Sequence, residues 1–139
     1  MHYKGFNMKI KIVILAVCFA LLSVGCSPEP VSIESIHLLE SLDEEMGTQQ
    51  QTGILPAEIN NIFLSVKVNH ITPEDEIKVV WTFLDTDNII DEQISSVDQA
   101  GSGYVNFNIH IAEGFPSGNY TADVYLNGTH EQKLDFSVQ

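Results

Sequence analysis

The chain has 139 residues, of which 19 are acidic and six are basic, and its formal net charge at pH 7 is −13. This length allows one small domain besides a targeting segment. Because nucleic-acid binding needs Lys and Arg side chains that neutralise phosphates, the composition excludes it as the main function.

The N-terminal segment has the pattern of an export signal. Met8-Lys9-Ile10-Lys11 is followed by an apolar run without charge, residues 12–24. A basic start and an apolar run of roughly 7–15 residues are typical of a signal peptide, whereas a spanning helix needs about 20 apolar residues. We predict a signal helix over residues 1–25, starting at Met1 or, in the more compact layout, at Met8. An ordinary secretory signal and a retained membrane helix are the alternatives.

A cysteine follows the apolar run. The sequence Leu22-Ser23-Val24-Gly25-Cys26 resembles the lipobox of bacterial lipoproteins, in which a small residue directly precedes the cysteine. The resemblance implies cleavage between Gly25 and Cys26 and a lipid on Cys26. Several acyl chains give a stable hold on a membrane, whereas one gives only marginal binding. We therefore expect an exported domain anchored in the cell membrane or the outer membrane.

The predicted anchor also defines the composition of the exported part. Cys18 is removed with the signal, so the folded domain has no thiol for a disulfide or a zinc site. All 19 acidic residues but only three lysines follow Cys26, which gives a formal charge of −16. We interpret this acidity as a soluble, self-repelling surface, with cation binding as the alternative. Residues 26–30 contain two prolines and predict a short extended tether.

Residues 31–139 are predicted to fold as one all-β domain. Apolar and polar residues alternate with a period of two, which is typical of strands. The first segment is ambiguous because its apolar spacing also fits a helix, although its β-branched residues favour a strand. The seven expected strands cover residues 31–39, 62–68, 77–84, 89–95, 104–111, 120–126 and 134–138.

The connections between these segments favour antiparallel pairing. Asn127-Gly128 is a strong hairpin signal because both residues accept positive φ. Residues 116–119 predict a tight turn, and no gap contains a helix long enough for a parallel crossover. We therefore predict a two-sheet antiparallel sandwich of about seven strands, with Trp81 in its core.

The order of the motifs is similar to that of immunoglobulin-like domains in exported prokaryotic lipoproteins. The motifs are an acidic loop at 43–47, the segment 62–66, the Trp81 strand, Gly118-Asn119-Tyr120 and a final Phe136-Ser137-Val138. The Gly-x-Tyr step also resembles the tyrosine corner of such sandwiches, although the disulfide of antibody domains is absent. The resemblance implies a recognition or scaffold module and no catalysis; this is an analogy of fold.

The sequence shows no pattern typical of a catalytic centre. The histidines after Cys26 are scattered and lack metal-ligand spacing, and no Gly-x-Ser-x-Gly motif occurs. We expect a non-enzymatic binding or scaffold module whose partner is an unidentified envelope protein or extracellular ligand. A small hydrolase with paired carboxylates is a distant alternative, because such pairs meet in space and not in sequence.

Two sets of residues are candidates for binding. Asp85, Asp87 and Asp91 place oxygen donors close together, as calcium prefers, although the glycine and spacing of an EF-hand are missing. They suggest a calcium-stabilised adhesion or carbohydrate-recognition domain as the alternative function; a solvated loop is the simpler interpretation.

The second candidate set is a sheet face. Residues facing away from Trp81 are expected to form a partner-binding patch, with ordinary solvent exposure as the alternative. They are Val80, Thr82, Leu84 and Tyr125.

Overall fold

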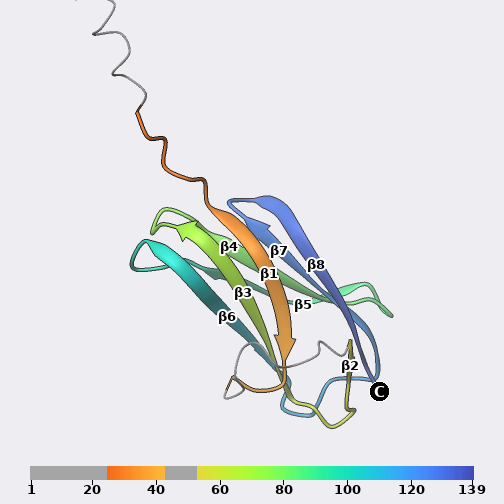
Figure 1. Ribbon diagram of the computed structural model, residues 1–139. Coiled ribbons are helices and arrows are strands. Elements are labelled where there is room, and N and C mark those ends of the chain that lie inside the picture. The colour runs from red at the N-terminus through yellow and green to blue at the C-terminus, as the bar shows by residue number, and fades with distance from the viewer. Residues whose placement is uncertain (1–24, 43–52) are drawn as a thin grey trace, which may run out of the picture.

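The computed structural model describes residues 25–42 and 53–139. In this part of the chain eight strands form two sheets that face each other (Figure 1). The strands are β1 (Ser32–Leu39), β2 (Ile54–Leu55), β3 (Asn61–Ile71), β4 (Ile77–Phe83), β5 (Asn88–Ser95), β6 (Gly101–His110), β7 (Gly118–Leu126) and β8 (Thr129–Val138). One sheet has the order β1-β3-β6, and the other has the order β2-β8-β7-β4-β5.

Seven of the strands coincide with the predicted segments, so the all-β sandwich is confirmed. The ambiguous first segment is a strand, β1, which pairs antiparallel with β3. The strand β2 was not predicted, and it pairs parallel with β8, so the antiparallel prediction is wrong for this pair. A two-residue strand has no periodicity by which a sequence could reveal it. The signal helix, apart from Gly25, and the acidic loop at 43–47 lie outside the described residues.

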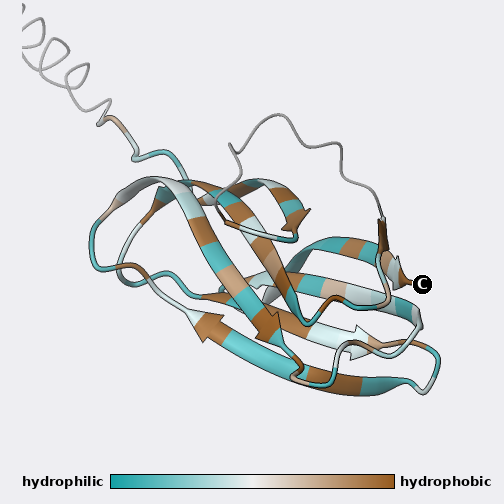
Figure 2. Cartoon of the chain, turned by 90° about the horizontal axis from the view of Figure 1, so that it is seen from below, coloured by the Kyte–Doolittle hydropathy of each residue, from teal (hydrophilic) through white to brown (hydrophobic). Residues whose placement is uncertain are grey.

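The core lies between the two sheets, where their inward faces meet. Figure 2 shows hydrophobic and hydrophilic residues alternating along the strands, which is the pattern that buries one face of each sheet. Trp81 and Tyr120 are each 1% exposed, and both pack against Phe136 at ring-centroid distances of 6.3 and 5.2 Å. The aromatic side chains of three neighbouring strands thus fill the centre of the sandwich.

A glutamine side chain spans each open side of the sandwich. Gln93 of β5 donates from Nε2 to the carbonyl oxygen of Asn108 on β6 at 2.6 Å, and its Oε1 accepts from Trp81 Nε1 at 3.4 Å. On the other side Gln132 of β8 donates to the carbonyl oxygen of Ile33 on β1 at 3.4 Å. These bonds satisfy backbone carbonyls at the sheet edges, where no neighbouring strand does so.

Tyr120 forms the tyrosine corner that the resemblance implies. Its hydroxyl donates to the carbonyl oxygen of Pro116, four residues upstream, at 2.5 Å. Burial raises the pKa of Tyr120, and the negative charge of Asp85 raises it further. The bond fixes the chain entering β7, because it joins the core tyrosine to the preceding loop.

The two turns at one end of the sandwich are joined by a hydrogen-bond network. Asn127 and Gly128 have φ values of 50° and 83°, which confirms the predicted hairpin turn. Asn127 Nδ2 donates to Asp75 Oδ1 at 2.9 Å, and the Thr72 amide and hydroxyl donate to Asp75 Oδ2 at 2.8 and 2.9 Å. The hydrogen bonds from Asn127 and Thr72 lower the pKa of Asp75.

The Asp75→Asn variant should be less stable than the parent protein at pH 7, and the difference should disappear in acid. The folded-state pKa of Asp75 is lowered, so its contribution is present above the unfolded-state pKa and is lost as pH falls through the folded-state pKa. Because the carboxylate is solvent-accessible, we expect a loss below about 1 kcal/mol. Thermal unfolding at pH 7 and pH 3 measures it. The exposed Asp98→Asn should not lower stability at pH 7. A difference for Asp75→Asn that is as large at pH 3 would contradict the argument.

Candidate binding surface

The segment that leads into the sandwich starts with Cys26. This cysteine is exposed, and residues 25–31 have no regular secondary structure before β1 begins at Ser32. Glu29 contacts the sandwich at His70, near the end of β3, with 2.6 Å between Glu29 Oε2 and His70 Nε2. Figure 1 shows this segment entering at the end of the sandwich opposite to β2 and the C-terminus.

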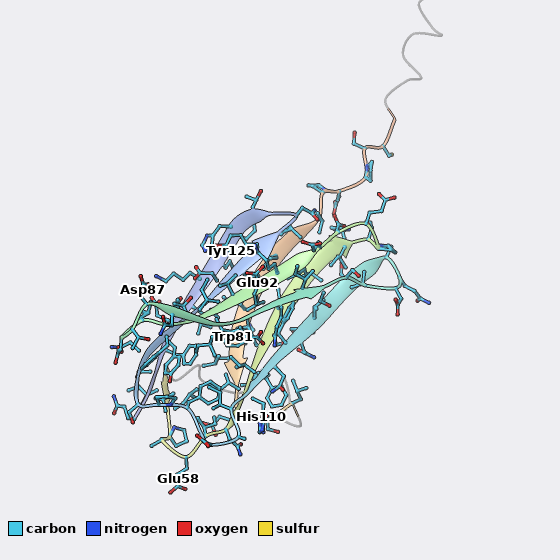
Figure 3. All side chains as sticks on the ribbon, turned by 180° about the vertical axis from the view of Figure 1, so that it is seen from behind. Glu58, Trp81, Asp87, Glu92, His110 and Tyr125 are labelled. Atoms are coloured by element: carbon cyan, nitrogen blue, oxygen red, sulfur yellow. The ribbon has the colours of Figure 1, made fainter. Side chains whose placement is uncertain are left out.

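The structure does not gather the three candidate calcium ligands into a metal site. Among the residues described, no group of three or more His, Cys, Asp or Glu side chains could hold a metal ion. Asp87 lies in the turn at the tip of the β4–β5 hairpin (Figure 3), where its φ is 55°. Asp85 Oδ1 accepts from the backbone and side-chain amides of Asn119 at 3.2 and 3.3 Å, and Asp91 Oδ2 accepts from Gln93 at 2.9 Å. Asp85 thus binds the neighbouring strand β7, whereas Asp91 binds a residue of its own strand β5, so each carboxylate has a structural partner.

The residues of the predicted partner face lie on the outer face of the five-stranded sheet. Val80 is paired with Asp123 of β7, and Thr82 is paired with Thr121. These residues alternate with the buried Val79 and Trp81, so they point away from the core. The period of two in the sequence therefore identified the face correctly, whereas its binding role stays a prediction.

Tyr125 on this face is held in a row of polar contacts. Lys78 Nζ lies 4.6 Å from the centroid of the Tyr125 ring, and the His130 ring packs edge-on at 5.1 Å. The row continues at both ends, with 3.9 Å between Lys78 and Glu92 and 2.7 Å between His130 and Asp123. Figure 3 labels Tyr125 and Glu92. These contacts orient the Tyr125 ring on the surface, which lowers the entropy lost when an aromatic residue enters an interface.

Beside the predicted Leu84, two exposed isoleucines of β5 that the sequence did not single out lie at this edge of the sheet. Ile89 is 64% exposed, Ile94 is 59% exposed and Leu84 is 41% exposed. A register shift in the β4–β5 ladder makes Ile90, and not Ile89, pack against the core. Such a bulge reverses the alternation of inward and outward side chains along a strand. A strict period of two therefore places Ile89 and Ile90 on the wrong faces of the sheet. The candidate binding surface therefore extends from Val80 to the edge strand β5.

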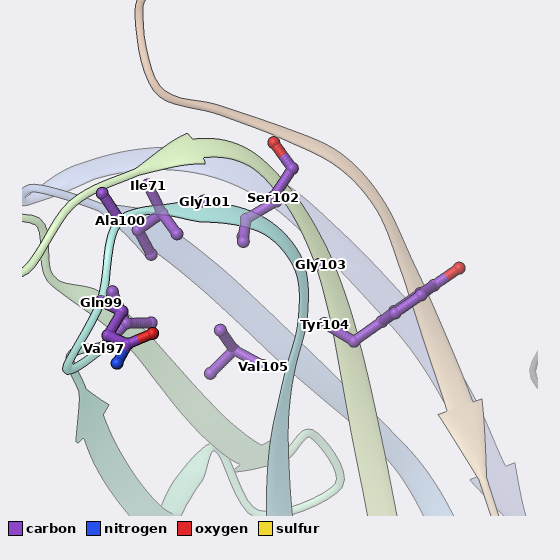
Figure 4. A pocket seen from close by; sticks show the side chains of 10 residues that line it. Ile71, Val97, Gln99, Ala100, Gly101, Ser102, Gly103, Tyr104 and Val105 are labelled. Atoms are coloured by element: carbon purple, nitrogen blue, oxygen red, sulfur yellow. The ribbon is translucent and has the colours of Figure 1, made fainter.

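A hollow of about 230 Å³ lies at the start of β6, close to the end where the tether enters (Figure 4). Its lining contains no charged residue. The hollow exists because Gly101 and Gly103 occupy inward positions, and a Cβ atom at either would meet nothing within 4 Å. The lining residues are Val68, Ile71, Val97, Gln99, Ala100, Gly101, Ser102, Gly103, Tyr104 and Val105.

Comparisons with known proteins bear on the fold. No protein-family model and no curated protein matches the chain. An immunoglobulin-like protein from Pseudomonas aeruginosa is similar to it in structure, with a TM-score of 0.55 and 14% identity over 81% of this chain and 99% of that one. The fold is immunoglobulin-like. The C-terminal domain of wzt is also similar, with a TM-score of 0.52 and 12% identity over 78% of this chain and 73% of that one.

The likeness extends to a much larger protein. An alkylpurine DNA glycosylase from Pseudomonas fluorescens, in complex with DNA, matches 78% of this chain with 13% identity and a TM-score of 0.48, and this chain spans 30% of its length. The immunoglobulin-like architecture rests on the Pseudomonas aeruginosa protein, and at 14% identity that likeness shows the fold alone, because one such fold carries many unrelated functions.

Proposed function

We propose that the protein is a lipoprotein, anchored outside the cytoplasm through Cys26, whose immunoglobulin-like sandwich is a non-catalytic binding or scaffold module of the cell envelope. The observation that carries the proposal is the position of Cys26, directly after the apolar segment and at an exposed site. The stretch from Cys26 to Ser32 reaches roughly 20 Å when extended, which lets the sandwich stand clear of a membrane.

Two further findings concern the described residues. No helix among residues 25–42 and 53–139 is long and apolar enough to cross a membrane. In the same residues the carboxyl groups of Glu34 and Asp75 have lowered pKa values, because of hydrogen bonds from Lys67 and Asn127 respectively. A carboxylic acid catalyst needs the opposite, a raised pKa that keeps its proton near neutral pH. These lowered values are typical of carboxylates that stabilise structure.

The proposed module binds its partner through the outer face of β4 and β5. Ile89 and Ile94 expose apolar surface there, and the oriented Tyr125 ring lies on β7, on the far side of β4. Aromatic and large apolar side chains surrounded by polar residues are typical of the centre of protein–protein interfaces. The calcium-dependent alternative has no comparable support in the described residues, where Asp85 accepts hydrogen bonds from Asn119 and Asp91 from Gln93.

The anchor is tested by fatty-acid labelling of the full chain in a bacterial host that processes lipoproteins. The parent protein should incorporate an alkyne-tagged fatty acid and fractionate with membranes. Cys26→Ser should remove the label, because serine has no thiol to acylate. Cys18→Ser is the matched control and should keep full labelling, since the signal that contains it is removed.

Three results would refute the anchor. They are an unlabelled parent protein, a label that persists in Cys26→Ser, or a parent protein that stays in the cytosol. Mass spectrometry of the purified protein gives an independent measurement, because cleavage before Cys26 and acylation change its mass together.

A further inference from the structure

The edge of β6 that faces away from β3 has no pairing strand among the residues described. Asn108 directs its carbonyl oxygen to this edge, where Gln93 of β5 binds it, whereas the Ile111 amide donates to Asn60 on the β3 side. Alternate residues of an antiparallel strand direct both backbone groups to the same side. Tyr104 and Asn106 therefore present their amide and carbonyl groups at the free edge.

The other sheet edges carry features that block the addition of a strand, and β6 does not. The ladder of β1 is interrupted at Glu34, which forms an ion pair with Lys67 at 2.7 Å. The ladder of β5 is interrupted at Ile90, and the strand carries two acidic residues, Asp91 and Glu92. The edge strand β2 has only two residues. Charges, bulges and short length are the usual protections of edge strands.

The strand β6 is long and uncharged, and the register shift in its ladder, between Gly103 and Gly101, comes from an extra residue in β3. Its ten residues include no Asp, Glu, Lys, Arg or Pro, and its pairing with β3 is continuous from Gly103 to His110. Such an edge is a template for an extended peptide, in which backbone hydrogen bonds provide affinity and pockets for alternate side chains provide specificity. The charges and the short length that prevent pairing at the other edges are thus missing from β6.

The hollow provides the pocket that such a peptide needs. It lies beside Gly101 and Gly103, on the inward side of β6, where Phe107 and Ile109 fill the core further along the strand. A strand added at the free edge directs every second side chain to that side. The volume of about 230 Å³ and the uncharged lining fit one aliphatic or aromatic side chain.

The charges around the edge select the kind of peptide. Exposed acidic residues lie before and after β6, at Asp98 and Glu113. If a second copy paired antiparallel with this strand, Asp98 of each copy would approach Glu113 of the other. Because both copies carry a large negative charge, such pairing would be repulsive. A peptide with basic ends meets attraction at the same positions.

We propose that the free edge of β6 at Ser102–Asn106 binds an extended segment of a partner protein, with basic ends and an apolar side chain that enters the hollow beside Gly103. This inference rests on the proposed binding function but not on the lipid anchor, so the two can fail separately. The partner segment becomes an additional strand of the three-stranded sheet.

The test measures the binding of synthetic peptides to the purified full-length protein by fluorescence anisotropy. The probe alternates valine and threonine around a central leucine and has two lysines at each end; its counterpart has glutamates at the ends. The lysine peptide should bind at least tenfold more tightly. Hydrogen exchange of the Tyr104 and Asn106 amides should slow when it binds, because these amides become hydrogen-bonded.

Two variants locate the site. Asn106→Pro removes an amide at the free edge and keeps the hydrogen bonds between β6 and β3. Gly103→Leu places a side chain in the hollow, where a Cβ atom meets nothing within 4 Å. Each should weaken binding at least tenfold while circular dichroism shows a folded protein; if Asn106→Pro does not fold, Gly103→Leu decides. Ser32→Pro, at the first residue of the opposite edge strand, is the matched control and should bind normally.

Several outcomes would overturn the proposal. They are no binding of the lysine peptide, equal binding of both peptides, and unchanged binding in Gly103→Leu. A parent protein that sediments as a dimer and becomes a monomer in Asn106→Pro would also overturn it, because the edge would then bind a second copy.

Discussion

Replacing Trp81 with alanine should reduce the free energy of unfolding by about 3–5 kcal/mol. The side chain is 1% exposed and lies at the centre of the sandwich, with its ring edge-on to Phe136 at 6.3 Å. The substitution removes this packing and leaves a cavity between two rigid sheets that cannot collapse into it. It also removes the indole N–H that donates to Gln93 Oε1, which orients the bridge to β6.

Because domains of this size have total stabilities of about 5–15 kcal/mol, Trp81→Ala should bring the protein close to unfolding at room temperature. Urea unfolding followed by circular dichroism measures the change. Leu84→Ala is the control: this residue directly follows β4 and is 41% exposed, so its substitution should cost at most about 0.5 kcal/mol. A loss below 1 kcal/mol for Trp81→Ala would mean that the two sheets do not pack around this ring.

Gly118→Ala should destabilise the protein by about 1–3 kcal/mol, because the added methyl group has no space. An ideal Cβ at this position lies 2.4 Å from Asp85 Oδ2 and 2.7 Å from Phe83 Cε2. Its φ of 148° is also one that residues with side chains rarely adopt. The Asp85 carboxylate binds Asn119 and the Phe83 ring packs on Tyr120 at 4.7 Å, so displacing either neighbour disturbs the start of β7.

The same substitution at Gly103 is the matched control for this experiment. Both glycines lie in strands, but a Cβ at Gly103 meets nothing within 4 Å. Gly103→Ala should therefore be neutral or stabilise the protein by up to about 1 kcal/mol, since it restricts the unfolded chain. Thermal and urea unfolding of the two variants should differ in sign or clearly in size. Equal losses would show that close contact at Gly118 is not what requires glycine there.

The sequence predicted the fold well wherever a strand has one buried and one exposed face. The alternation at Val105–Ile109 and at Ala122–Leu126 reports burial directly, because successive side chains point to opposite faces. Thr121 departs from this pattern, since it lies on the outer face but is 3% exposed. The β2 strand could not be predicted, because two residues are too few to show an alternation of apolar and polar side chains. The exposed isoleucines of β5 escaped it since the bulge at Ile90 shifts the alternation by one residue.

The candidate surfaces were predictable to different degrees. Val80 and Thr82 could be placed on one face from their spacing alone. The hollow beside Gly103 could not, because it depends on the space between two sheets whose strands are distant in the sequence. Asp85 was a possible calcium ligand in the sequence, with a solvated loop as the simpler interpretation, and its hydrogen bonds to Asn119 could not be predicted because only the folded chain brings the two residues together.

The two glutamine bridges have a consequence for chemical ageing. Each amide donates to a backbone carbonyl across one open side, so the loss of ammonia from Gln93 or Gln132 would leave an anionic oxygen facing the oxygen of Asn108 or Ile33. At Gln93 the new charge would also confront the Asp91 carboxylate, 2.9 Å from the present amide nitrogen. Hydrolysis of one of these side chains would thus replace a hydrogen bond between the two sheets with a repulsive contact. The two sheets would then separate first along that side of the sandwich.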